Sequence, residues 1–172
     1  MMLGSCFAEN MGGKFSYYKF DVDVNPCGII YNPLSVANVL RLIMEGKPFG
    51  KDDLRKVGEK WVSLYHHGAF SSTDPEECLR RINERLERAT RELRSLDLLV
   101  ITWGTAWVYK HVGENLVVSN CHKIPSQEFE RSRLSVEDIV KEYVELIGRL
   151  REINPGLRVC LLYTSPSPRD ST

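Results

Sequence analysis

The sequence predicts an α/β domain in which helices cover a parallel β-sheet. Short apolar runs suited to buried strands alternate along the chain with longer segments whose apolar residues recur at helical spacing. The chain has 172 residues, of which 42% are hydrophobic and 27% are charged. This length and composition are sufficient for one globular domain with a sizeable core, and they argue against a second domain.

Four segments predict the strands of the sheet. Residues 1–3 read as the end of a first strand, and residues 20–24 alternate apolar with acidic side chains, as a half-exposed strand does. Residues 98–103 form a continuous apolar run, which predicts a central strand buried on both faces. Another strand is expected to begin at residue 157, after a turn rich in Asn, Pro and Gly.

Four helices are predicted from capping residues and from apolar stripes at helical spacing. The first follows Ser5. Asn32 before Pro33 caps the second, which should end near Gly46, while Asp74 caps the third and Ser135 the fourth. The apolar stripes expected on the four helices are Phe7, Ala8, Met11 and Phe15; Val36, Val39, Leu40 and Ile43; Leu79, Ile82, Leu86, Ala89 and Leu93; and Ile139, Val140, Tyr143, Val144, Ile147 and Leu150.

Two segments lack a clear period. Residues 48–73 are expected to be an insertion or loop with a short polar helix around residues 52–57, and residues 105–134 a long irregular stretch. Neither segment is therefore expected to join the sheet.

The charge and cysteine content exclude several classes of protein. Basic and acidic residues balance at 23 each, so the basic surface typical of nucleic-acid binding is not expected. No apolar run approaches the ~20 residues that cross a bilayer, and the start does not resemble a signal peptide, which predicts a cytoplasmic protein without a membrane span. The five cysteines are odd in number and form no CxxC pair, so we expect reduced thiols and no metal or other cofactor.

Four motifs resemble, in order, those of one protein family. They are residues 4–8 (GSCFA), 25–33 (NPCGIIYNP), 102–109 (TWGTAWVY) and 120–123 (NCHK). Over about residues 2–158 their spacing is similar to that of the bacterial GSCFA family, which takes its name from the first motif. That family resembles the SGNH hydrolases, and the resemblance implies a three-layer α/β/α flavodoxin-like fold and action on ester bonds.

Ser5 is the candidate catalytic residue. A Gly-Ser step between a strand and a helix puts a hydroxyl at the sheet edge where open α/β folds bind ligands. The helix start also offers unpaired N–H groups to a developing oxyanion. A serine in this position commonly caps the helix instead, and that alternative stays open. The resemblance favours a nucleophile or a former nucleophile.

The resemblance also implies an oxyanion hole that Ser5 would share with two further segments. Gly28 fits the glycine that follows the second strand, although it fits equally well as a turn glycine beside Pro26. Gly104 and Thr105 stand where SGNH hydrolases have a Gly-x-Asn segment, but the asparagine is missing. Either the Thr105 hydroxyl donates in its place, or the oxyanion loses a donor worth about 3 kcal/mol.

The histidine pairs are weaker candidates for catalysis. His66 and His67 are adjacent, as are Cys121 and His122, and adjacent strand residues point to opposite faces. Neither pair is therefore arranged to act on one ligand, and ordinary hydrogen-bonded loop histidines are expected. Polar residues of the family motifs that could line a pocket are Asn25, Asn32, Asn120 and His122.

The end of the chain suggests a foreign origin. One reading frame of a common transposase-type sequencing adapter encodes residues 160–170 residue for residue, so we expect a partial GSCFA domain at 1–159 and a non-native segment at 160–172. The alternative is a native strand and a Pro-rich loop. The sheet would then be incomplete, which should leave an edge strand unpaired and apolar helix faces exposed.

The expected function follows from the resemblance and from this boundary. SGNH enzymes take their histidine base and its orienting aspartate from a late Asp-x-x-His segment, and no histidine here has an aspartate three residues before it. We expect the parent protein to hydrolyse small acyl esters, including those of carbohydrates, and this chain to be inactive. The alternative is a non-catalytic module that binds a carbohydrate or a protein partner.

Overall fold

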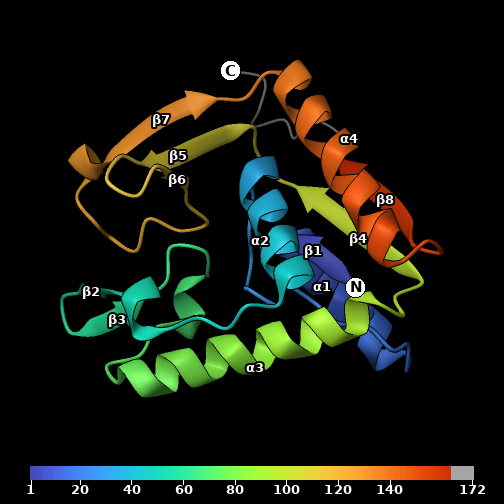
Figure 1. Cartoon of the computed structure of the whole chain (residues 1–172), viewed down its shortest axis with the longest axis horizontal. Helices are drawn as coiled ribbons and strands as arrows, with labels where there is room; N and C mark the ends of the chain where they lie inside the picture. Colours follow the sequence, from blue (N-terminus) through green and yellow to red (C-terminus); the bar gives the residue numbers. More distant parts are fainter. Residues whose placement is uncertain (164–172) are drawn as a thin grey trace.

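The computed structural model describes residues 1–163, which fold into helices packed on a parallel sheet with smaller antiparallel pieces beside it (Figure 1). The helices are α1 (Cys6–Tyr17), α2 (Pro33–Glu45), α3 (Pro75–Leu93) and α4 (Val136–Ile153). The parallel strands are β1 (Met2–Gly4), β4 (Leu98–Trp103) and β8 (Arg158–Tyr163). This confirms a mixed α/β protein with a parallel sheet.

The sheet is built around β4, which lies between β1 and β8. Met2 pairs with Val100 on one side of β4, and Leu98 pairs with Arg158 on the other. The strand expected at residues 20–24 is reduced to a parallel bridge between Val24 and Met2. The central position predicted for residues 98–103 is confirmed, but burial on both faces is only partial, because Leu98 is exposed and Val100 and Trp103 are only partly buried.

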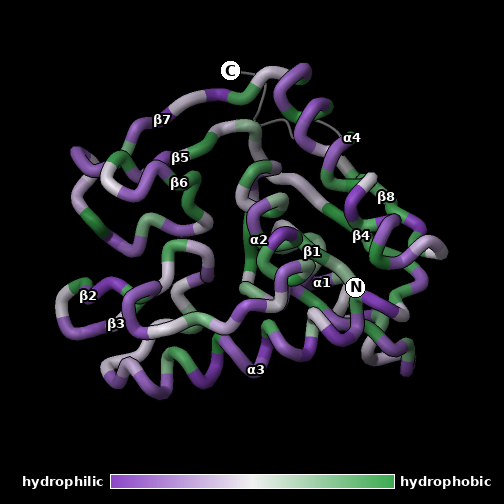
Figure 2. Tube along the Cα trace, in the orientation of Figure 1, coloured by the Kyte–Doolittle hydropathy of each residue, from purple (hydrophilic) through white to green (hydrophobic). Residues whose placement is uncertain are grey.

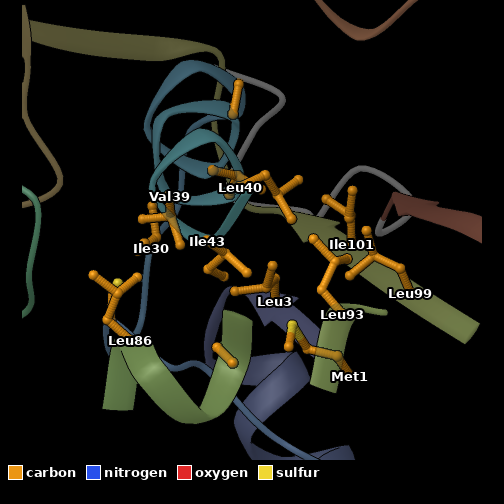
Figure 3. Close-up of a cluster of buried hydrophobic side chains, with 14 of the residues drawn as sticks. Met1, Leu3, Ile30, Val39, Leu40, Ile43, Leu86, Leu93, Leu99 and Ile101 are labelled. Carbon is orange, nitrogen blue, oxygen red and sulfur yellow. The ribbon is translucent and has the colours of Figure 1, made fainter. Parts of the chain in front are cut away.

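The main core fills the space between one face of the sheet and helices α2, α3 and α4. Figure 3 shows the part of this core that α2, α3 and the strands contribute. Leu3, Leu99 and Ile101 point from the sheet into this core and are almost completely buried. The predicted stripe of α2 is confirmed, and on α3 only Leu79 is less than fully buried. Figure 2 shows the resulting alternation of hydrophilic and hydrophobic segments along α3.

The caps predicted for these helices are present. Asn32 accepts a hydrogen bond from the amide of Ser35, and Asp74 accepts one from the amide of Glu76. Ser135 and the side chain three residues later form the reciprocal bonds of a capping box. The first residue of a helix can be predicted from the sequence because both partners of the capping hydrogen bond lie within one turn.

Helix α1 differs from its prediction. It packs against the sheet face opposite the main core and buries Ala8 and Gly12, whereas Phe7 and Phe15 are 40% and 37% exposed. The reason is a close approach: a Cβ on Gly12 would lie 2.3 Å from a methyl group of Val24. The helix therefore meets the sheet through its smallest residues, and its larger apolar residues stay at the margin.

Helix α4 also buries a narrower stripe than predicted. Tyr143, Leu146 and Leu150 face the core, but Val140 and Val144 are exposed. The buried residues follow the side of α4 that contacts α2 and β4. The two valines lie on the side towards β8, where no further element within residues 1–163 covers them.

Both segments expected to be irregular contain strands. Residues 48–73 include a hairpin of β2 (Arg55–Val57) and β3 (Lys60–Val62), flanked by the short 3-10 helices η1 (Lys51–Asp53) and η2 (Gly68–Phe70). Residues 105–134 form an antiparallel sheet in the order β6-β5-β7, with a 3-10 helix, η3, before β7. The bounds are β5 (Trp107–His111), β6 (Leu116–Val117), η3 (Ser126–Glu128) and β7 (Phe129–Arg133).

These small strands escaped prediction because they are short and mostly exposed. They bury few side chains and carry no apolar alternation long enough to detect. Figure 1 places them to one side of the parallel sheet. A small second core of Leu64, Val118 and Ile124 holds them together.

Strand β8 crosses the boundary expected between residues 159 and 160. Cys160 pairs with Val100, and Leu162 pairs with Thr102, in the same register as the strand's earlier residues. The rest of the segment whose foreign origin was predicted, residues 164–172, lies outside the described residues. Within the described part of the chain β8 pairs only with β4.

A substitution at Gly4 should test how closely β1 and β4 must approach. Gly4 has φ +130°, and a Cβ there would lie 1.9 Å from the carbonyl oxygen of Thr102. We expect Gly4→Ala to lower the free energy of unfolding by at least about 2 kcal/mol in urea titrations. Gly13→Ala is the matched control, because a Cβ there meets nothing within 4 Å and alanine should stabilise α1 by up to about 1 kcal/mol. Equal midpoints for the two variants would contradict this account.

Candidate functional site

Ser5 lies at the junction of β1 and α1, at the carboxyl end of the parallel sheet. Its backbone is extended, with φ −71° and ψ 178°, and its Oγ accepts a hydrogen bond from the amide of Phe7 at 3.3 Å. Ser5 is therefore the N-cap of α1, which was the open structural alternative for this residue. The side chain is also nearly buried, since only 5% of the residue is exposed.

Thr102 is the second polar residue of this site. Its Oγ1 lies 3.0 Å from the Ser5 Oγ and also accepts the Ser5 amide at 3.0 Å. The Thr102 carbonyl lies 3.2 Å from the same amide. Sequence reasoning missed Thr102 as a site residue, although it is the first residue of the third family motif. Its role depends on the register that pairs Gly4 with Thr102 across the sheet.

Gly104 lies beside Ser5, but its amide is already engaged. A Cβ on Gly104 would lie 3.6 Å from the Ser5 Cβ, so the predicted proximity of these two residues is present. The amides of Gly104 and Thr105 both donate to the carbonyl of Tyr31, at 2.8 and 3.2 Å. The Thr105 hydroxyl accepts the amide of Trp107 at 3.0 Å. The Gly104 amide thus already has an acceptor within the protein, whereas the Thr105 hydroxyl accepts a hydrogen bond and its own proton has no acceptor among the described residues.

Gly28 occupies a tight turn. Its amide donates to the carbonyl of Asn25 at 2.8 Å, and its φ of +83° favours glycine. A Cβ there would lie 2.3 Å from the Cβ of His67. The turn role left open for Gly28 is therefore present, and within the described residues its amide has no bond to Ser5.

Asn25 and Asn32 support the backbone around the site. Asn25 accepts the Gly4 amide through Oδ1 at 2.9 Å and donates from Nδ2 to a carboxylate oxygen of Glu9 at 2.8 Å. It therefore ties the end of β1 to α1. Asn32 caps α2 through the amide of Ser35. Neither amide side chain is free to line an open pocket.

Asn120 and His122 come together near β3 and away from the contacts of Ser5. The Asn120 Oδ1 accepts the His122 amide at 2.7 Å, and the His122 ring contacts the carbonyl of Ser63 at 2.8 Å. Burial lowers the pKa of His122 below its ordinary value. Both residues line a shallow pocket with Lys60 and Val62 of β3. Cys121 lies between them in the chain and is partly buried.

His66 is a buried core residue. Its Nδ1 lies 2.8 Å from the Ser63 hydroxyl, and its ring packs edge-on against Phe49 and beside Phe70. Desolvation by burial lowers the pKa of His66 to about 3, so the ring is neutral at physiological pH. By contrast, His67 is partly exposed and caps η2.

His111 completes the set of four histidines. Its ring faces Arg55 and Glu128 in the small antiparallel region. Within residues 1–163, none of the four histidines is hydrogen-bonded to Ser5, and no cluster of His, Cys, Asp and Glu side chains could hold a metal ion. The described residues therefore provide the candidate nucleophile without a histidine base.

This geometry defines an α/β protein with a capping serine at the carboxyl edge of a parallel sheet. The model of the GSCFA family matches residues 1–171, and the chain belongs to the GSCFA family. No curated protein and no solved structure matches it. None of the helices in the described part of the chain has both the length and the apolar character needed to span a bilayer.

The buried His66 should make stability depend on pH. In the unfolded chain a histidine binds a proton below about pH 6.5, whereas folded His66 stays neutral down to about pH 3. Because the unfolded state binds more protons in this window, stability falls as the pH falls, by up to about 1.4 kcal/mol per pH unit. Urea titrations between pH 7 and 5 should show this slope. His66→Gln should reduce this slope, leaving the part contributed by His122, whereas His67→Gln should not; an unchanged slope in His66→Gln would refute the assignment.

The Thr102 hydroxyl should stabilise the fold through Ser5. We expect Thr102→Val to lower the free energy of unfolding by about 1–3 kcal/mol, because it leaves the buried Ser5 hydroxyl without its side-chain partner. Thr90→Val is the matched control, since the Thr90 hydroxyl is buried without a partner within the described residues and its removal should be neutral or stabilising. The same loss in both variants would show that the Ser5 contact contributes nothing.

Proposed function

We propose that this chain carries the nucleophile of a serine acyl hydrolase or acyltransferase that acts on small acyl esters, with acetyl esters of carbohydrates as the leading substrate class. The observation that carries the proposal is the position of the Ser5 hydroxyl, at the carboxyl end of β1, at the N-terminus of α1 and beside the Gly104 backbone. Membership of the GSCFA family adds the resemblance to SGNH hydrolases.

The strand order supports a ligand site at this position. Val24 bridges to one side of β1, and β4 pairs with the other side, so the chain changes direction across the sheet at β1. Open α/β sheets bind ligands at such a switch point, outside the carboxyl ends of the strands. The order of the Val24 segment, β1, β4 and β8, with α1 on the face opposite α2, α3 and α4, favours a three-layer flavodoxin-like domain of the SGNH type.

The chemistry assigns each group a role. The Ser5 oxygen would attack the ester carbonyl, and a base must accept its proton. The hydrogen bond to Thr102 would orient the Ser5 hydroxyl, making Thr102 a positioning residue. The histidine base would come from outside residues 1–163, as the resemblance to SGNH hydrolases implies.

The oxyanion would need donors that the internal hydrogen bonds leave available. The amide of Cys6, the first residue of α1, has no acceptor within the described residues, as is normal at a helix start. The amides of Gly104 and Thr105 would have to leave the Tyr31 carbonyl to take part. We therefore propose that substrate binding displaces the Tyr31 segment.

Ester hydrolysis by a protein that contains this chain together with the histidine base tests the proposal. It should release p-nitrophenol from p-nitrophenyl acetate, and Ser5→Ala should lower kcat by at least about 10³-fold, because the attacking oxygen is lost. Ser95→Ala, at the exposed end of α3, is the matched control and should keep the parent rate. Equal rates for the parent and Ser5→Ala would exclude Ser5 as the nucleophile.

A second candidate function is a non-catalytic module that binds carbohydrate. The specific observation in its favour is that the amides of Gly28, Gly104 and Thr105 all donate within the protein. Under this proposal the protein binds an acetylated oligosaccharide in calorimetric titration without turnover, and Ser5→Ala binds it with unchanged affinity. Turnover of that ligand by the parent would exclude this candidate.

A further inference from the structure

The fourth family motif, residues 120–123, forms a tight turn that has no role in the proposed hydrolase. A hydrogen bond from the Ile124 amide to the Cys121 carbonyl, at 2.9 Å, closes the turn. Its two central residues, His122 and Lys123, have φ +49° and +61°. Turns with two such residues usually contain Gly, Asn or Asp, because other side chains are strained there. Strained backbone of this kind is concentrated at functional sites.

The fold accounts for His122 in this turn, but it does not account for Lys123. The His122 ring donates from Nε2 to the carbonyl of Ser63 at 2.8 Å and so joins the turn to the segment after β3. Lys123 is exposed, and within residues 1–163 it forms no ion pair. No contact within the described residues therefore requires a lysine in this strained position.

Lys123 and Lys60 of β3 line the same pocket, which has a volume of about 490 Å³. No Asp or Glu is among the described residues that line it, and Lys60, like Lys123, forms no ion pair within residues 1–163. Burial lowers the pKa of His122, so its ring adds no charge at physiological pH. The lining of the pocket thus carries two positive charges and no negative charge.

The rest of the lining supplies neutral donors and an apolar wall. The Asn120 Oδ1 accepts the His122 amide at 2.7 Å, which leaves the Asn120 Nδ2 free to donate. The Ser71 hydroxyl also lines the pocket and has no hydrogen-bond partner among the described residues. Val57 and Val62 contribute apolar surface. Small-molecule sites typically combine a few polar groups with apolar surface in this way.

We propose that this pocket binds a small molecule with a phosphate monoester group, which Lys60 and Lys123 contact directly. A phosphate monoester carries close to two negative charges near pH 7, which matches the two ammonium groups. Its oxygens accept hydrogen bonds, so the neutral donors of Asn120 and Ser71 suit it as well. The volume is within the range of small-molecule sites, which leaves room for an organic part of the ligand beside the valines.

Other anions match this pocket less well. A single carboxylate carries one charge and would leave one ammonium group unmatched. A nucleic-acid backbone needs an extended basic surface, whereas acidic and basic residues balance at 23 each in this chain. The inferred site does not use Ser5 and does not depend on the proposed hydrolase activity.

Calorimetric titration of the whole chain with phenyl phosphate at low salt tests the site. The parent should bind one equivalent in a saturable manner. Lys60→Gln and Lys123→Gln should each raise Kd by at least about tenfold, because each removes a charge-assisted contact with the phosphate. Lys141→Gln is the matched control at an exposed lysine of α4, on the other side of the molecule from the β2–β3 hairpin (Figure 1), and it should leave Kd unchanged.

Lys123→Gly separates a role in binding from a role in folding. Glycine adopts a φ of +61° without strain, so the urea midpoint of this variant should equal or exceed that of the parent. Its Kd for phenyl phosphate should rise as in Lys123→Gln. A purely structural lysine would give the opposite pattern, with a lower midpoint and unchanged binding.

Four outcomes would overturn the proposal. They are a parent that shows no saturable binding of phenyl phosphate, an unchanged Kd in both glutamine variants of the pocket lysines, an equal loss of affinity in Lys141→Gln, and benzoate binding as tight as that of phenyl phosphate. The last outcome would exclude a phosphate site, because benzoate offers the same ring with a single carboxylate charge.

Discussion

The close parallel pairing of β1 with β4 is the constraint on which the rest of the structure depends. Gly4 of β1 pairs with Thr102 of β4, and the two backbones are so close there that a side chain on residue 4 would collide with the Thr102 carbonyl. This contact fixes where β1 ends, and therefore where α1 begins and where the Ser5 hydroxyl lies. It also sets Thr102 against Ser5, so one pairing register positions both polar side chains of the candidate site.

The polar groups around Ser5 satisfy one another almost completely. The Tyr31 carbonyl accepts two amides from the segment after β4, and Asn25 joins the end of β1 to α1. Burying a polar group without a hydrogen-bond partner costs several kcal/mol of folding free energy, so this network stabilises the carboxyl edge of the sheet. A substrate whose oxyanion is to be stabilised at Ser5 must replace some of these bonds. The hydrolase proposal requires that replacement, whereas the binding-module proposal leaves the bonds in place.

Apolar residues of the helices are either buried in the main core or left exposed beside β8. Helices α2, α3 and α4 cover one face of the sheet, and their buried residues contact each other as well as the strands. The side of α4 towards β8 has no such cover in the described residues, and the valines there remain exposed. The same helix therefore contributes one side to the core and leaves its other side exposed within the described residues.

The sequence by itself determined the features that depend on neighbouring residues. Asn32 and Ser135 cap their helices through partners three residues away, the apolar run before Trp103 forms the central strand, and the family motifs place a serine between strand and helix. Only the tertiary structure decided what those residues meet. The partner of Ser5 lies 97 positions away, and α1 faces the sheet through Gly12 because Val24 approaches it closely. Periodicity and capping report short-range energies along the chain, whereas these contacts depend on strand register and backbone approach, which no local pattern encodes.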